Sequence, residues 1–203
     1  MQLFNLSTNA VFVIPTLVPS FIGLQTTTQA SVSAPCTIDN DDPLEANLNV
    51  VCCATIGTAA LTPENSVVEA GERTTLSLDW THPIGWRKLD SVDLLISGDE
   101  GTVLHARWHE AANAFSLLNS AADKFLQIAE AGSPARLESP LATLHLEEST
   151  GGGLPGQTVT IDYGVEFKTK AAGQTFSVEA FAIDDEGNQQ GFESVGTITV
   201  SPR

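Results

Sequence analysis

Two clusters of acidic and amide side chains are the strongest candidates for a functional site in this sequence, because a hard cation such as calcium is bound by oxygen ligands of this kind. The first cluster comprises Asp39, Asp41 and Asp42, and the second comprises Asp184, Asp185 and Asn188. Neither supplies from its side chains the roughly six to eight oxygens that calcium takes, and the first lacks the glycine and the glutamate of an EF-hand loop. Calcium binding is therefore a hypothesis for both clusters, and turn formation is the favoured interpretation.

The chain has 4 histidines, and their spacing gives little support for a metal or catalytic site. His105 and His109 would share one face of a helix, but on a strand they lie about 13 Å apart, which is too far to hold one ion. His82 precedes a proline in a turn, and His145 is isolated among strand residues. Both are therefore expected to be surface histidines.

Catalytic motifs are also missing from the sequence, which contains no phosphate-binding loop, Gly-x-Ser-x-Gly elbow or HExxH motif. Glu147 and Glu148 are adjacent, so on a strand they would point to opposite faces and could not act as a catalytic pair. We therefore predict a non-catalytic protein without a cofactor, apart from the calcium hypothesis. Hydrolysis is the least favoured function.

The composition limits the partners of the protein. The chain of 203 residues has 25 acidic and 9 basic side chains, which gives a formal net charge of −16. This charge repels phosphate backbones, so we expect no nucleic acid partner. The cysteines Cys36, Cys52 and Cys53 lack the spacing of a zinc site. In a secreted protein Cys36 could pair with Cys52 or Cys53, and the sequence leaves their disulfide state open.

The first 57 residues differ in composition from the rest of the chain. There is no charged side chain in residues 1–38, and residues 10–24 are apolar. This run resembles the core of an export signal but lacks a positively charged start, and the alternative is an apolar strand or linker that ends a preceding module. Its length and its prolines argue against a membrane helix. We expect residues 1–57 to be an apolar segment with an acidic linker, and residues 58–203 to be one domain.

From residue 74 onward, apolar side chains alternate with polar ones at the period of a half-buried strand. The inward positions of the first runs are Leu76, Leu78 and Trp80, then Val92, Leu94 and Ile96, then Leu104, Ala106 and Trp108. Similar runs cover residues 141–147, 159–167, 175–183 and 196–200, and glycines 151–153 are expected to form a flexible turn. We predict that residues 159–167 and 175–183 form an antiparallel hairpin at the centre of a sheet.

One segment also fits a helix. Within residues 108–131 apolar side chains recur every three or four positions, as in an amphipathic helix. The alternative is a strand that ends at residue 109 and pairs with residues 114–118. We favour this hairpin, and a short helix at 121–129 stays open as an alternative because a glycine and a proline follow it.

The segment TAALTPENSVVEAGERTTLSLDW, which begins at residue 59, resembles the entry to an immunoglobulin-like or fibronectin type III-like bacterial surface module. The resemblance continues through WRKLDSVDLLI from Trp86 and DDEGNQQGF from Asp184, and it ends with GTITV at Gly196. It implies an all-β fold, an antiparallel immunoglobulin-like β-sandwich, over about residues 59–203.

The resemblance and the lack of a catalytic motif together predict a structural, adhesion or assembly module of a secreted or cell-surface protein, with other protein modules or surface glycans as partners. The alternative is a carbohydrate-binding module that uses aromatics such as Trp86 or Trp108 as stacking platforms, although alternation places Trp108 inward. The expected contact regions are the loops at residues 82–87, 98–101 and 184–192, or an exposed edge strand.

Overall fold

The computed structural model describes residues 37–38, 50–51, 55–119, 123–126 and 128–203. Strands β1 (Thr37–Ile38) and β2 (Val50–Val51) pair antiparallel with each other. The acidic residues Asp39, Asp41 and Asp42 and the cysteines Cys36, Cys52 and Cys53 lie outside the described residues. The predictions made for them therefore stay predictions.

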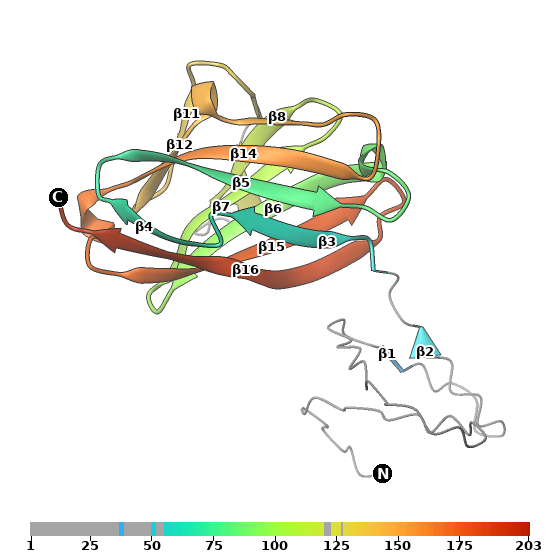
Figure 1. Cartoon of the computed structure of the whole chain (residues 1–203), viewed down its shortest axis with the longest axis horizontal. Helices are drawn as coiled ribbons and strands as arrows, with labels where there is room; N and C mark the ends of the chain where they lie inside the picture. The colour runs from blue at the N-terminus through green and yellow to red at the C-terminus, as the bar shows by residue number, and fades with distance from the viewer. Residues whose placement is uncertain (1–36, 39–49, 52–54, 120–122, 127) are drawn as a thin grey trace, which may run out of the picture. The chain divides into compact units, whose positions relative to one another are not determined.

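The rest of the described chain is an all-β sandwich of two sheets, as predicted (Figure 1). The first sheet has the strand order β11 (Arg136–Glu138), β12 (Ala142–His145), β14 (Thr158–Phe167), β5 (Arg73–Thr81) and β3 (Thr58–Thr62), and β13 (Thr150–Gly152) also pairs with β14. The second has the order β10 (Ala129–Glu130), β8 (Ala114–Asn119), β7 (Gly101–His109), β6 (Leu89–Gly98), β15 (Thr175–Asp184), β16 (Gln189–Ser201) and β4 (Asn65–Glu69), and β9 (Lys124–Phe125) also pairs with β8.

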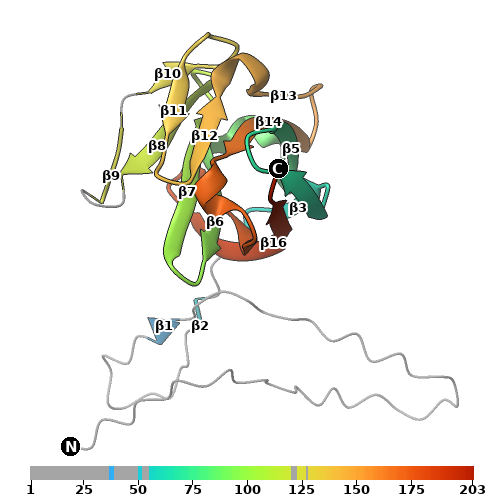
Figure 2. The same cartoon turned by 90° about the vertical axis from the view of Figure 1, so that its left-hand side faces the viewer.

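Short 3-10 segments, η1 (Trp86–Lys88), η2 (Leu146–Glu148) and η3 (Thr169–Ala171), lie in the connections, and the described residues contain no α-helix. Seen from the side in Figure 2, β3 and β16 lie near each other, away from β10 and β11. The candidate functional site lies at this edge, where the two sheets meet.

The core between the sheets consists of the alternating side chains that the sequence pattern identifies. In β5 the side chains of Leu76, Leu78 and Trp80 are 0% exposed. The inward residues of β14 are fully buried as well, namely Val159, Ile161, Tyr163, Val165 and Phe167. Because a slip of one residue would turn each set to the outside, this burial confirms the predicted register of both strands.

Residues 104–118 form the predicted hairpin, in which β7 pairs antiparallel with β8 and Trp108 lies opposite Phe115. The helix considered at 121–129 is wrong where the structure describes that segment, because β9 and β10 are short strands that pair with β8. The misleading pattern has a physical cause. β8 buries four consecutive residues, Ala114 to Leu117, and burial on both faces removes the two-residue period.

The predicted hairpin between residues 159–167 and 175–183 is wrong, because the two strands belong to different sheets. β14 lies between β5 and β12, whereas β15 lies between β6 and β16. The connection through η3 therefore crosses from one sheet to the other. Both strands bury alternate residues in the same core, so their sequence pattern cannot distinguish a hairpin from such a crossing.

Three boundaries also differ from the predictions. β16 begins at Gln189 rather than at residue 196, so the preceding loop covers only residues 185–188. Of the glycines predicted as a turn, Gly151 and Gly152 belong to β13, which pairs with β14. The strand expected at 141–147 ends at His145, and residues 146–148 form η2 instead.

The strand order shows which of the expected contact loops lie together. Residues 82–88 and 184–188 share one end of the sandwich, where the Asp185 N–H donates to the Lys88 carbonyl oxygen at 2.8 Å. The turn at residues 98–101 follows the far end of β6 and so lies at the opposite end. The three loops therefore do not form one surface.

Candidate functional site

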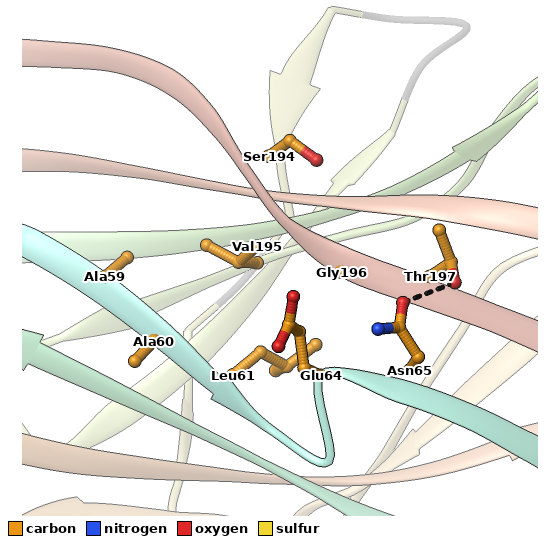
Figure 3. A pocket seen from close by; sticks show the side chains of 9 residues that line it. All are labelled: Ala59, Ala60, Leu61, Glu64, Asn65, Ser194, Val195, Gly196 and Thr197. Atoms are coloured by element: carbon orange, nitrogen blue, oxygen red, sulfur yellow. Dashed lines mark hydrogen bonds between the residues drawn. The ribbon is translucent and has the colours of Figure 1, made fainter. Parts of the chain in front are cut away.

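A cleft lies between β3, the end strand of the first sheet, and β16 of the second (Figure 3). Its volume is about 440 Å³. The lining residues are mostly small, and they are Ala59, Ala60, Leu61, Glu64, Asn65, Ser194, Val195, Gly196 and Thr197. The cleft arises because the chain leaves the first sheet after β3 and joins the second as β4, which pairs with β16 only from Thr197 onward.

Hydrogen bonds close the cleft at both ends. At one end the Gln190 side chain binds both backbone groups of Gly57, since its Oε1 accepts from the N–H at 3.0 Å and its Nε2 donates to the carbonyl oxygen at 2.9 Å. At the other end the Thr197 N–H donates to the Glu64 carbonyl oxygen at 2.9 Å. Between these contacts β3 and β16 are not paired in the described part of the chain.

β3 presents an unpaired backbone edge to the cleft. Among the described strands it pairs only with β5. The backbone groups of Gly57 point toward β16, where the Gln190 side chain meets them. Groups two residues apart in a strand point in the same direction, so the N–H and C=O groups of Ala59 and Leu61 also face the open side.

This edge of β3 lacks the features that commonly protect exposed strands. Its sequence, TAALT, has neither a charged residue nor a proline, and its pairing with β5 has no bulge. β16 differs, because Val195 is an extra residue between the partners of Val178 and Glu179 and forms a bulge. A bulge distorts the edge of a strand. β3 is therefore the better template for an added strand.

Glu64 directs its carboxylate into the cleft (Figure 3). Its side chain makes no hydrogen bond or ion pair with the described residues, and the lining includes no lysine, arginine or histidine. The other acidic residue near this edge, Glu193, accepts a hydrogen bond from Gln190 Nε2 at 2.7 Å. The cleft therefore combines open backbone groups with one unpaired negative charge.

The acidic cluster at Asp184, Asp185 and Asn188 builds its own turn. Asp184 is 8% exposed, and its Oδ1 accepts from the backbone N–H groups of Glu186 and Asn188 at 2.9 and 2.8 Å. Its Oδ2 accepts from Asn188 Nδ2 at 2.8 Å. Gly187 has φ of 83°, as the turn requires. Both carboxylate oxygens of Asp184 are thus engaged within the loop.

These contacts also set the acidity of Asp184. Burial alone would raise the pKa of this carboxyl, but the hydrogen bonds from Asn188 and Glu186, together with nearby His82, lower the pKa below its usual value. In the described residues no group of three His, Cys, Asp or Glu side chains is arranged to hold a metal ion. Calcium binding stays a hypothesis.

The tryptophans proposed as stacking platforms are buried. Trp86 is 2% exposed and donates from Nε1 to the Leu154 carbonyl oxygen at 2.9 Å, and Trp108 is 1% exposed. Among the described residues, the aromatic side chains outside the core are instead Phe125, Phe181 and Phe192, which contact His105 or one another on the outer face of the second sheet. The sequence carries a signal for Phe181, which occupies an outward position between buried alanines.

His105 and Arg107 lie on the same outer face and bind Asp93, which is 1% exposed. Arg107 donates from Nε and Nη2 to the two carboxylate oxygens at 2.7 and 3.0 Å, and His105 Nε2 lies 2.8 Å from Oδ2. The Arg107 guanidinium stacks on Phe125 at 4.2 Å. The ion pair with Arg107 therefore compensates the buried charge of Asp93. We call the surface formed by Phe125, Phe181, Phe192, His105 and Arg107 the outer-face patch.

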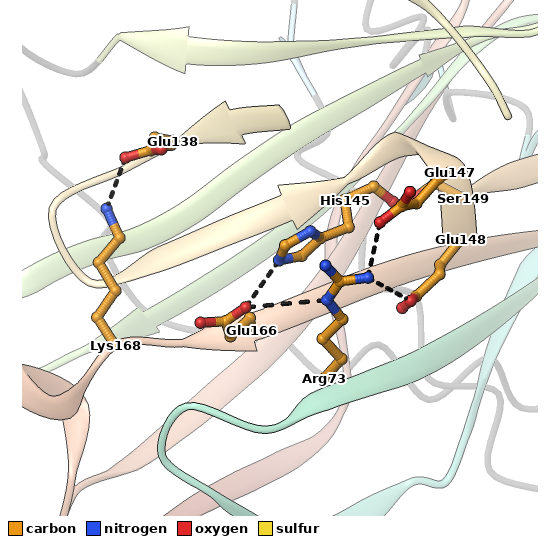
Figure 4. Close-up of polar contacts among 8 residues, drawn as sticks. All are labelled: Arg73, Glu138, His145, Glu147, Glu148, Ser149, Glu166 and Lys168. Atoms are coloured by element: carbon orange, nitrogen blue, oxygen red, sulfur yellow. Dashed lines mark hydrogen bonds and ion pairs between the residues drawn. The ribbon is translucent and has the colours of Figure 1, made fainter. Parts of the chain in front are cut away.

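A second charged network lies on the outer face of the first sheet (Figure 4). Glu147 and Glu148 do not point apart as predicted, because they belong to η2 and both accept from Arg73 Nη1 at 2.7 Å. The hydrogen bonds that Arg73 donates, first the one to Glu148 and then the one to Glu147, raise the pKa of Arg73. Glu166 lies 4.0 Å from Arg73 Nε and 2.9 Å from His145 Nε2. One guanidinium thus bridges Glu147 and Glu148, and its single positive charge offsets only part of the negative charge of these carboxylates.

The histidines are buried or partly buried rather than on the surface. His82 is 4% exposed, and its Nδ1 accepts from the N–H groups of Ile84 and Gly85 at 3.2 Å. His145 is 1% exposed, so the prediction of a surface position is wrong for both. His109 lies 2.9 Å from Ser116 Oγ, and burial lowers its pKa. As predicted for a strand, His105 and His109 bind different partners.

Comparison with known proteins finds no protein-family model that matches this chain and no curated protein similar to it in sequence. Among the described residues, no helix is both long enough and apolar enough to cross a membrane.

Proposed function

We propose that this chain is a non-catalytic assembly module of a secreted or cell-surface protein, and that it joins its partner by strand addition to β3. The observation that carries this proposal is the unprotected edge of β3, where the backbone groups of Ala59 and Leu61 face an open cleft. An extended peptide can pair with such an edge through its main chain and insert alternate side chains into the space beside it. The immunoglobulin-like or fibronectin type III-like resemblance of residues 59–203 agrees with this role.

Selection of peptide ligands tests strand addition directly. Random nine-residue peptides displayed on phage are selected on the immobilised full chain and then bound to the variant Ala59→Pro. Proline removes the free N–H of residue 59 and leaves the β3–β5 hydrogen bonds in place. We expect the selected peptides to bind the native chain and to lose at least tenfold in affinity on Ala59→Pro.

Ala59→Thr is the matched control, because it adds bulk at the same position and keeps the N–H. It should retain the peptides, and hydrogen exchange of the native complex should show protection of the amides of Ala59 and Leu61. Thermal melting checks that Ala59→Pro folds. A second blocking variant is Ala59→Lys, which places an inward-pointing charge on the edge strand and keeps the backbone intact. Peptides that bind equally to both blocked variants would contradict strand addition.

Glycan binding is a second candidate, and the outer-face patch favours it. Phe192 is 42% exposed beside His105, with ring centroids 5.6 Å apart, so an apolar ring lies next to polar side chains. If this face binds sugar, a glycan array probed with the full chain should give signals that Phe192→Ala abolishes. Leu154→Ala, at an 85% exposed residue of an end loop, should leave them unchanged.

A further inference from the structure

We infer that the strand accepted by the cleft is cationic, with a lysine or arginine side chain that meets Glu64. This inference rests on the proposed strand addition and specifies the partner that such a site selects. It is an extended segment of another protein.

The first step is the position of Glu64. The residue lies two positions after the end of β3, and its carbonyl oxygen accepts the hydrogen bond that closes one end of the cleft. Its carboxylate lies beside Leu61 and Val195 and projects into the space between the sheets (Figure 3). A strand paired with β3 turns every second side chain toward this space. One of those side chains must therefore meet the carboxylate.

The second step is electrostatic. The Glu64 carboxylate has no hydrogen-bond or ion-pair partner among the described residues, and no basic side chain lines the cleft. An incoming strand would remove this carboxylate from part of its water, which costs free energy unless an opposite charge accompanies it. The formal net charge of the chain, −16, also favours the approach of a cationic segment and opposes that of an acidic one.

The third step concerns size. Ala59, Ser194 and Gly196 leave little side-chain volume on the walls of the cleft, and a Cβ added to Gly196 would collide with the Glu64 carbonyl oxygen. The free volume of about 440 Å³ is thus bounded by backbone at the Glu64 end. A long flexible lysine or arginine fits along this space.

Two measurements test the inference: the amino-acid composition of the selected peptides, and the energetic coupling between a basic peptide residue and Glu64. Peptides that require the free edge of β3 should be enriched in lysine and arginine over aspartate and glutamate. In fluorescence anisotropy with the full chain, replacing the basic residue of a synthetic peptide by glutamine should weaken binding about fivefold, and Glu64→Gln should do the same. Together the two changes should cost no more than either one, because both remove one interaction.

Glu193→Gln is the matched control, since Glu193 is also acidic and lies on β16 but is already bound to Gln190. It should not discriminate between the basic and neutral peptides. Edge-dependent peptides whose affinity is indifferent to Glu64→Gln would overturn the cationic partner and leave strand addition standing. A selection that yields no peptide dependent on the β3 edge would overturn both.

Discussion

At the scale of single residues, the glycines of β13 have a sequence typical of a flexible turn, although one of them is required by packing. Gly151 lies against the Trp108 indole, and a Cβ at this position would collide with the ring. The Asn113 side chain holds the two together, because its Oδ1 accepts from both the Gly151 N–H and Trp108 Nε1 at 3.0 Å. The glycine is therefore required by contact with the tryptophan.

Gly151→Ala should consequently destabilise the protein by about 1–3 kcal/mol, as expected for overpacking of a fixed core. Gly152→Ala is the matched control, because nothing lies within 4 Å of a Cβ at that neighbouring position. Urea unfolding followed by tryptophan fluorescence measures both variants. Equal stability of the two would mean that Trp108 moves freely and that the contact does not select glycine.

Asp184 is predicted to make stability depend on pH. Its pKa is lowered in the folded state, so the charged carboxylate contributes stability above its unfolded pKa of about 3.9, and that contribution is lost as the pH falls through the folded pKa. Asp184→Asn should cost about 1 kcal/mol at pH 7, because the hydrogen bonds to Oδ1 become neutral ones and the amide nitrogen in place of Oδ2 cannot accept from Asn188 Nδ2. The cost should fall as the pH is lowered through the folded pKa, and it should be smaller at pH 3 than at pH 7.

Unfolding of wild type and Asp184→Asn in urea at pH 7 and at pH 3 measures this difference. Asp185→Asn is the control, because Asp185 is exposed and its side chain takes no part in the hydrogen bonds of the turn. A penalty of Asp184→Asn that is the same at both pH values would show that shape rather than charge holds the loop.

At the scale of elements, the sequence predicts strands well where one face is buried. Alternation identifies the inward residues of β5, β14 and β15 because their outer faces are more polar. It fails for β8, where both faces are covered, and it does not say which strands are neighbours. β14 and β15 are consecutive, yet each pairs elsewhere. Pairing depends on contacts between distant segments, which periodicity does not encode.

The candidate site was only partly accessible to sequence reasoning for the same reason. An exposed edge strand was among the predicted contact regions, but the cleft depends on a change of sheet between β3 and β4. Likewise, the sequence predicts that the adjacent residues Glu147 and Glu148 point to opposite faces of a strand. In the structure they belong to η2, and both contact Arg73, which lies on the distant strand β5. Such sites arise from tertiary packing, so residue types alone do not reveal them.

At the scale of the whole molecule, the sandwich begins before the boundary that the sequence predicts. The sequence places it between residues 57 and 58. The structure, however, buries Ile56 at 3% exposure, and its carbonyl oxygen accepts from Trp80 Nε1 at 3.3 Å. Gly57 is bound on both backbone groups by Gln190. These contacts attach the two residues to the core and to the end of the cleft.

We therefore predict that residues 55–203 unfold cooperatively, and that residues 58–203 are less stable by about 2–4 kcal/mol. The shorter chain loses the burial of Ile56 and leaves the indole N–H of Trp80 and the side-chain amide of Gln190 without their backbone partners. Urea unfolding of both chains, with the full chain as reference, measures the difference. In the chain of residues 55–203, Gln190→Ala should reproduce only the part of this stability loss that comes from the contacts with Gly57. If the two truncated chains were equally stable, Ile56 and Gly57 would be attached to the sandwich without stabilising it, and the boundary read from the sequence would be correct.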